Sequence, residues 1–196
     1  KFGVDIVVEA ITKYIGGHSD VMMGVTVCNK KHLNSIIRWK RNSGQCVGPD
    51  DIFLALRGLR TLPLRLEKSQ KNSIKLAKFL SNQKEVKKVY HPALKEHPDH
   101  KLWKRDFNGA CGIFGIEFKD YITTKMAEFF ADNCLLFGKG ASWGGYESLM
   151  TMTDIKSNRI IKKSYVPNGE YLRIYVGIEN IEDIIDDVSI SFTKMR

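Results

Sequence analysis

The sequence lacks the features of a membrane-spanning or exported chain. It has no apolar run long enough to cross a bilayer, so we expect no membrane partner. The first residues show neither the apolar region nor the small-residue cleavage site of a signal peptide, and they run directly into a strand-like stretch. We therefore expect the chain to begin inside a domain. Internal repeats and low-complexity tracts are also absent.

Cysteine is scarce, and its spacing excludes several classes of site. The four cysteines are Cys28, Cys46, Cys111 and Cys134. They form no C-x-x-C pair, which argues against a zinc ribbon or a redox dithiol and favours reduced thiols in the cytoplasm. His97 and His100 are close enough to suggest a metal site, but two neighbouring prolines and the lack of a fixed helix face favour a solvated loop from Tyr90 to His100. We expect no bound metal.

The chain carries a formal charge of +9, which raises the question of a nucleic-acid partner. Its basic residues form only small local groups, one at residues 84–88 and one comprising Arg159, Lys162 and Lys163. Neither group lies beside a helix-turn-helix motif or an exposed aromatic platform. These groups are more typical of solvated helix faces or loops, so we expect no nucleic-acid partner.

With 196 residues, 43% of them hydrophobic, the chain can form one good core or two small ones. The apolar spacing predicts strands over 4–8, 21–27, 86–90, 112–118 and 171–178, and helices over 30–41, 52–60, 64–82, 123–133 and 181–194. Pro63 is expected to interrupt the helical pattern between 52 and 82, and Asn180 to cap the last helix. This order indicates an α/β protein in which a small sheet has helices on one side.

Lys13 follows an apolar stretch where a lysine has no packing role. The nearly continuous β-branched run at 4–8 is typical of a strand buried on both faces, and Gly16 and Gly17 allow the backbone to approach a ligand closely. A desolvated lysine can lose its proton and attack a carbonyl, so the pattern suggests a Schiff-base site. The alternative is an ordinary solvated lysine at a strand end.

Two further segments contain candidate binding residues. The strand at 171–178 places Leu172 and Ile174 on one face and Arg173 on the other, where the guanidinium either pairs with an acid or binds a carboxylate. Residues 142–149, with the sequence SWGGYESL, combine a small flexible turn with an aromatic side chain and several donors. That segment suits the wall of a site, or an ordinary glycine turn anchored by a buried tryptophan.

Over nearly its whole length, the chain resembles the C-terminal half of the Cys/Met-metabolism family of pyridoxal-phosphate enzymes of fold type I. The similar segments occur in the family's order: AITKY at 10–14 with GHSD at 17–20, GPDD at 48–51, LRGLRTL at 56–62, WKRDF at 103–107 and SWGGYESL at 142–149. The γ-synthases and γ-lyases of the family usually have leucine where this chain has Trp143. The resemblance is therefore strongest to the β-lyases.

The resemblance implies that residues 1–62 are the end of the large cofactor-binding domain and that 63–196 form a smaller α+β domain with an antiparallel sheet. It implies that Lys13 binds pyridoxal 5'-phosphate and acts in catalysis, and that Thr12 contacts the phosphate. Arg173 would bind the α-carboxylate of an amino-acid thioether, and Ser142 and Trp143 would line the same pocket. The implied activity is carbon–sulfur β-elimination, which converts cystathionine to homocysteine, pyruvate and ammonia in methionine biosynthesis.

The family also implies a homo-oligomer, either a dimer or a tetramer. Two departures concern the pocket, since many members have serine in place of Ala10 and some β-lyases have tyrosine in place of Ala141. The half that precedes the lysine strand in the family is absent, so we expect a fragment, a cleaved chain or one piece of a complex, and an impaired enzyme in isolation. The alternatives are a γ-synthase or γ-lyase relative and a non-catalytic remnant that dimerises without cofactor.

Overall fold

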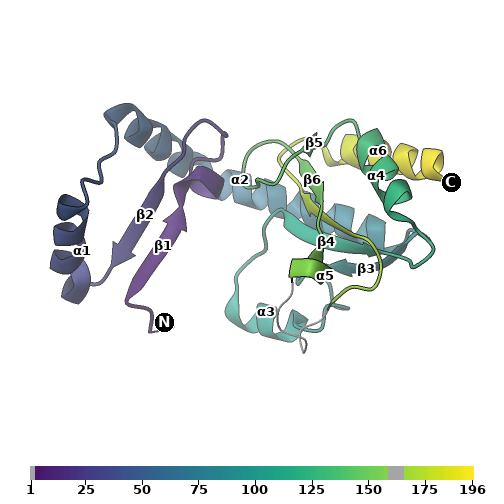
Figure 1. The fold of residues 1–196 in the computed structure, drawn as a ribbon, viewed down its shortest axis with the longest axis horizontal. Coiled ribbons are helices and arrows are strands. Elements are labelled where there is room, and N and C mark those ends of the chain that lie inside the picture. The colour runs from purple at the N-terminus through teal and green to yellow at the C-terminus, as the bar shows by residue number, and fades with distance from the viewer. Residues whose placement is uncertain (1–2, 159–165) are drawn as a thin grey trace. The chain divides into compact units, whose positions relative to one another are not determined.

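The computed structural model describes residues 3–158 and 166–196 (Figure 1). The chain divides into two compact units, Lys1–Pro63 and Leu64–Arg196, which are called unit 1 and unit 2 and are described separately. The basic group of Arg159, Lys162 and Lys163 lies outside the described residues. The domains predicted at 1–62 and 63–196 stay a prediction.

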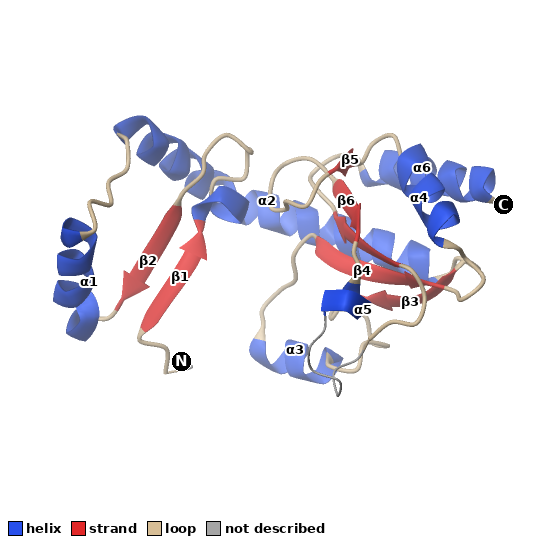
Figure 2. Ribbon diagram, viewed as in Figure 1, coloured by secondary structure: helices blue, strands red, loops and turns tan. Residues whose placement is uncertain are grey.

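Unit 1 is built on a two-stranded antiparallel sheet (Figure 2). Strand β1 (Ile6–Ala10) pairs with β2 (Gly24–Cys28), and a single π-helical turn, η1 (Ile11–Ile15), follows β1. Helix α1 (Lys30–Asn42) follows β2, and the first part of helix α2 (Pro49–Ser81) completes the unit. A small core of Ile11, Val21 and Ala55 joins the hairpin to α2.

The prediction that the first strand is buried on both faces is wrong. All five residues of β1 are exposed, and Val8 retains 74% of its accessible surface. Burial on two faces requires a packed layer on each side of a sheet. In residues 3–63 of the structure, β1 is paired with β2 alone and is covered on neither face.

The predicted interruption at Pro63 is also wrong, because α2 continues through this residue. Proline removes one helical hydrogen bond and costs about 3 kcal/mol in a helix interior. Pro63 and Leu59 are both exposed, so water can reach the carbonyl group that lacks its helical donor. The burial of Leu76 and Leu80 further along the helix offsets part of that cost.

Unit 2 contains a five-stranded mixed sheet in the order β3-β4-β7-β6-β5. Its strands are β3 (Val86–Tyr90), β4 (Ile113–Phe118), β5 (Gly138–Lys139), β6 (Leu149–Met152) and β7 (Tyr171–Tyr175). All pairs are antiparallel except β5 and β6. The remaining helices are α3 (His100–Asp106), α4 (Thr124–Asn133), α5 (Ile155–Asn158) and α6 (Ile181–Met195).

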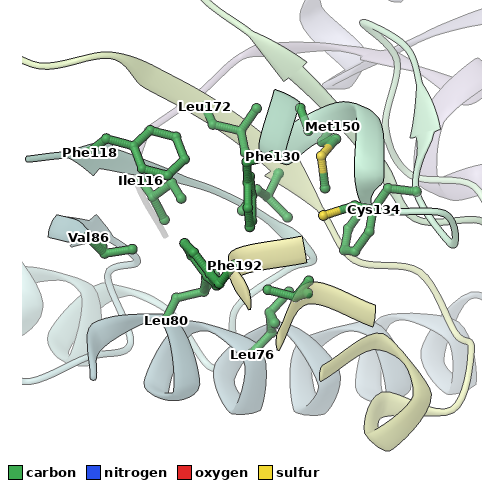
Figure 3. Packing of buried hydrophobic residues seen from close by; sticks show 14 of the residues in the cluster. Leu76, Leu80, Val86, Ile116, Phe118, Phe130, Cys134, Met150, Leu172 and Phe192 are labelled. Carbon is green, nitrogen blue, oxygen red and sulfur yellow. The ribbon is translucent and has the colours of Figure 1, made fainter. Parts of the chain in front are cut away.

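One face of this sheet carries the main hydrophobic core (Figure 3). Ile116 and Leu172 from the sheet pack with Leu80 of α2, Phe130 of α4 and Phe192 of α6, and each of these side chains is buried. Burying an apolar side chain of this size contributes about 1.5–3 kcal/mol. Strand β7, which pairs with β4 and β6, contributes Leu172 and Ile174 to this core. Asn180 caps α6 as predicted, since its Oδ1 accepts a hydrogen bond from the backbone N–H of Glu182 at 3.2 Å.

Two predictions about polar residues in unit 2 are corrected. His91 is only 1% exposed, so the segment from Tyr90 to His100 is not a fully solvated loop. The helical spacing over 64–82 also predicts that the serines of this segment face outward, and that prediction is wrong because Ser69 and Ser73 of α2 are buried. The Ser73 hydroxyl lies 3.2 Å from Nε2 of His91, and burial lowers the pKa of His91 to about 4.

Among the described residues, no helix is both long and apolar enough to cross a membrane.

Candidate functional site

Lys13 lies in the tight turn after β1 and not at the end of the strand itself. Its φ and ψ angles are −89° and −118°, outside the helical region, although it lies within η1. The backbone N–H of Gly16 donates to the Ile11 carbonyl at 2.7 Å, and that of Gly17 donates to the Lys13 carbonyl at 2.8 Å. Gly17 has a φ of 68°, which favours glycine. These bonds hold the half-buried lysine on a closed turn.

Thr12 fastens this turn to the segment before β2. Its backbone N–H donates to the Met23 carbonyl at 3.2 Å, and its hydroxyl lies 3.2 Å from the same oxygen. The hydroxyl oxygen also accepts a hydrogen bond from the Met23 N–H at 2.9 Å. If the hydroxyl proton turned to another acceptor, the Met23 carbonyl would keep the Thr12 N–H as its donor. Thr12 can therefore offer a proton to an anion without leaving a backbone group unpaired.

Helix α2 packs against the lysine turn at Gly58. A Cβ at Gly58 would lie 2.9 Å from the carbonyl carbon of Gly16 and closer still to the carbonyl oxygens of Ile15 and Gly16. One turn of α2 is thus in direct backbone contact with the lysine turn. Arg57 adds an ion pair with Asp20 at 2.9 Å. Both contacts lie within unit 1.

A second group of candidate residues lies in unit 2. Arg173 is at the centre of β7, paired with Gly115 of β4 on one side and Thr151 of β6 on the other. Its neighbours Leu172 and Ile174 enter the core, as predicted, so Arg173 projects from the opposite face of the sheet. Its guanidinium carbon lies 5.3 Å from the centroid of the Trp143 ring, within the range of a cation–π contact.

The segment at 142–149, called the Trp143 loop, leads into the first residue of β6 and is anchored to the end of β7. The Tyr175 hydroxyl donates to the Gly145 carbonyl at 2.7 Å, and the Ile178 N–H donates to the Tyr146 carbonyl at 3.0 Å. Burial raises the pKa of Tyr175 to about 12, so its hydroxyl keeps its proton and remains a donor at neutral pH. These bonds fix the loop that carries Trp143 beside the strand that carries Arg173.

The structure therefore brings Trp143 and Arg173 together in unit 2, with Ser142 exposed next to Trp143 in the chain. It places Thr12 and Lys13 together in unit 1. Sequence reasoning did not identify the contribution of Glu179, which accepts two hydrogen bonds from Ser148. A glutamate directly after the strand predicted at 171–178 and a serine inside a candidate motif were the available signals, but their separation in the chain hid the contact.

The residues of unit 1 fit a ligand that carries an aldehyde and a phosphate. An amine on a fixed turn can attack an aldehyde, and the adjacent Thr12 hydroxyl can donate to a phosphate oxygen. The described residues form no comparable site for a metal, because they hold no group of three or more His, Cys, Asp or Glu that could bind an ion.

Comparisons with known proteins agree on one family. The model of the Cys/Met metabolism PLP-dependent enzymes matches residues 1–193. Cystathionine beta-lyase of Haemophilus influenzae is 38% identical over 194 residues, covering 98% of this chain and 49% of that protein. An L-alanine/L-glutamate racemase of Wolbachia pipientis wMel is 36% identical over 196 residues, covering 99% of this chain and 48% of that protein.

A solved structure extends the likeness to the fold. The crystal structure of cystathionine gamma synthase from Xanthomonas oryzae pv. oryzae, in complex with aminoacrylate and cysteine, has a TM-score of 0.86 and 31% identity. The match covers 99% of this chain and 51% of that one. The chain thus spans about half the length of the relatives it matches.

Proposed function

This chain belongs to the Cys/Met-metabolism family of pyridoxal-phosphate-dependent enzymes, and from that premise we propose that it is part of a carbon–sulfur lyase. The proposed reaction is β-elimination from cystathionine, which with water gives homocysteine, pyruvate and ammonia. The predictions of the family, of its cofactor pyridoxal 5'-phosphate and of the fold class are confirmed. The choice of a β-lyase within the family is the proposal.

The observation that carries the proposal is the contact between Trp143 and Arg173. Trp143 is the residue by which the sequence resembles the β-lyases more than the γ-synthases and γ-lyases. The Trp143 ring lies within cation–π range of the Arg173 guanidinium, a contact that does not use up the group's N–H donors, and those donors can bind a carboxylate. This arrangement supports Arg173 as the group that binds the α-carboxylate of the substrate, with Ser142 and Trp143 lining the same pocket.

In unit 1 we assign Lys13 as the catalytic residue that binds the cofactor and Thr12 as a donor to its phosphate. When bound, the cofactor supplies an electron sink that stabilises the charge developing at the substrate Cα. Once the substrate amine has displaced it from the cofactor, the Lys13 amine would take the proton from Cα, and Arg173 would orient the substrate through its carboxylate. The turn closed by Gly16 and Gly17 restricts where the amine can lie, which lowers the entropy lost in positioning it.

The cofactor part of the proposal is tested by borohydride reduction. The longest natural polypeptide that carries these 196 residues is incubated with pyridoxal phosphate and reduced, and the labelled peptide is identified by mass. We expect one stable adduct on Lys13, which Lys13→Ala removes and Lys40→Ala, at an exposed lysine of unit 1, retains. Adducts scattered over surface lysines would contradict the assignment and favour the non-catalytic remnant.

The reaction is tested by product analysis with cystathionine. Pyruvate and homocysteine in equal amounts would support β-elimination. Cysteine with α-ketobutyrate would identify a γ-lyase, and synthesis of cystathionine from cysteine and an activated homoserine would identify a γ-synthase. Conversion of L-alanine to D-alanine without cystathionine cleavage would identify a racemase, the activity in the name of the Wolbachia relative. Each of the last three outcomes contradicts the β-lyase proposal.

We also propose that the intact protein is a cytoplasmic homo-oligomer. All four cysteines are free thiols, which suits a reducing compartment. Large apolar side chains on unit 1, including Val8, Trp39 and Phe53, are exposed, which is typical of surfaces that pack against other protein. Light scattering of the longest natural polypeptide tests the oligomer, and a monomer would contradict it.

A further inference from the structure

We propose that Glu179 is a positioning residue that holds the Trp143 loop against Arg173 and so sets the affinity for the substrate carboxylate. The substrate part of this inference rests on the proposed function. The positioning part rests on the hydrogen bonds of unit 2 alone. Glu179 lies four residues after the end of β7, on the segment to which the Trp143 loop is anchored.

The carboxylate of Glu179 binds Ser148 twice. The Ser148 backbone N–H donates to Oε1 at 2.5 Å, and the Ser148 hydroxyl donates to Oε2 at 3.0 Å. The same hydroxyl oxygen accepts a hydrogen bond from the Gly177 N–H at 3.0 Å. Ser148 is fully buried, so water cannot replace these bonds without opening the loop. One carboxylate thus fixes the C-terminal end of the Trp143 loop.

The segment that carries Glu179 is itself fixed from the other side by α2. The buried amide of Asn72 donates to the carbonyl oxygens of Gly177 and Glu179, at 3.1 Å and 2.9 Å. A Cβ at Gly177 would lie 2.6 Å from Oε2 of Glu179 and closer still to the Tyr146 carbonyl oxygen. The Glu179 carboxylate therefore has little freedom to move away from Ser148. Because Ser148 must reach this carboxylate, the position of Glu179 determines the position of the C-terminal end of the Trp143 loop.

The donor and acceptor pattern requires a carboxylate at position 179. Both Ser148 groups donate, and an ionised carboxylate offers two acceptor oxygens. A glutamine offers one acceptor oxygen and an NH2 group, so the NH2 must face either the Ser148 N–H, which is itself a donor, or the Ser148 hydroxyl, which would have to turn its proton away. Glu179→Gln therefore loses at least one of the two bonds that Ser148 donates to position 179, although it keeps the size of the side chain. The loosened loop should allow Trp143 to leave Arg173.

The experiment compares Glu179→Gln with Glu182→Gln, the same change at a glutamate exposed on the first turn of α6. In Glu179→Gln we expect KM for cystathionine to rise about tenfold and kcat to stay within about threefold, because substrate binding is affected and Lys13 is not. The borohydride adduct on Lys13 should be unchanged. Amide hydrogen exchange in residues 142–149 should become about tenfold faster in Glu179→Gln and stay as in the wild type in Glu182→Gln.

Ser148→Ala provides a second variant, which should accelerate the same exchange, and the double variant should add little because the two residues share one interaction. A Glu179→Gln protein with wild-type exchange and wild-type KM would overturn the inference. A fall in kcat with unchanged KM would also overturn it, since it would assign Glu179 to the chemistry. If the wild type does not cleave cystathionine, the proposed function fails, and the exchange rates still decide the positioning role.

Discussion

Replacing Gly58 by alanine tests the claim that α2 supports the lysine turn by direct backbone contact. The added Cβ would lie 2.9 Å from the Gly16 carbonyl carbon, inside the 3.4 Å at which ordinary contact begins, and closer still to two carbonyl oxygens. Alanine gains about 1 kcal/mol over glycine from helix propensity. Overpacking costs about 1–3 kcal/mol, and the upper half of this range, about 2–3 kcal/mol, applies here because the obstructing atoms belong to the backbone and cannot rotate away. The clash should therefore outweigh the gain in propensity.

We expect Gly58→Ala to weaken the turn by about 1–2 kcal/mol, measured as about 5- to 30-fold faster hydrogen exchange at the amides of Gly16 and Gly17. These two amides form the bonds that close the turn. The yield of the borohydride adduct on Lys13 should fall in parallel, since the turn that carries the amine is displaced.

Gly24→Ala is the matched control in the same unit. Its Cβ would lie 3.7 Å from the Glu9 carbonyl oxygen, an ordinary contact, so we expect no loss and a gain of about 0.5–1 kcal/mol from removing a strand glycine. If Gly58→Ala exchanges no faster than the wild type and retains the Lys13 adduct, the argument from close backbone approach is refuted.

Three further predictions concern buried ionisable groups in unit 2. Burial lowers the pKa of His91 to about 4 from 6.5, so its contribution to stability is present above pH 6.5 and is lost as the pH falls to 4. That loss is about 3 kcal/mol, and urea unfolding should show it in the wild type and not in His91→Asn. Replacing the fully buried Glu117 by leucine should lower the unfolding free energy by about 3–5 kcal/mol, because the Tyr90 hydroxyl and the N–H groups of Asn168 and Gly169 lose their acceptor, at about 1–3 kcal/mol each. Asp120→Ala, at the exposed partner of Lys87, should change it by less than about 1 kcal/mol. Burial raises the pKa of the Cys134 thiol to about 12, so Ellman's reagent should label exposed Cys46 within minutes and reach Cys134 only after denaturation, and rapid labelling of Cys134 in the native protein would contradict its burial.

The parts of the fold predicted from the sequence are those set by local periodicity. The division of β7 into a core face with Leu172 and Ile174 and an opposite face with Arg173 follows from the period of a strand. The cap of α6 by Asn180 follows from the chemistry of a helix start. Each of these two predictions depends only on residues that are close together in the chain. Such local patterns do not need information about distant segments, and the structure agrees with both predictions.

The errors concern features that depend on distant segments. The exposure of β1 is set by which layers cover it, and the local β-branched pattern carries no information about those layers. The burial of His91 depends on a polar partner for its ring in the interior. That partner is the Ser73 hydroxyl, which lies 18 residues earlier in the chain. Strand β5 has only two residues, too few for any period to be detected. The continuation of α2 through Pro63 depends on exposure and on packing beyond the proline, which a rule for isolated helices omits.

The candidate site follows the same division. Lys13, Thr12, Trp143 and Arg173 stood out because their motifs are local, and their roles stay predictions. The contact of Glu179 with Ser148 spans 31 residues, and neither residue type is unusual where it stands. Sequence patterns therefore selected the candidate residues, and the structure was needed to find the contacts that hold these residues in place.

The ion pair between Glu85 and Arg196 has a consequence for the order in which unit 2 folds. The Arg196 guanidinium donates to both carboxylate oxygens of Glu85, at 2.8 Å and 3.2 Å, across 111 residues of chain. A contact that closes so long a loop loses much chain entropy before it gains energy, so it should form late, after the transition state. Arg196→Ala should then leave the folding rate nearly unchanged and accelerate unfolding. During synthesis, the buried Glu85 carboxylate must wait until Arg196, 111 residues later in the sequence, has been added before its arginine partner is available.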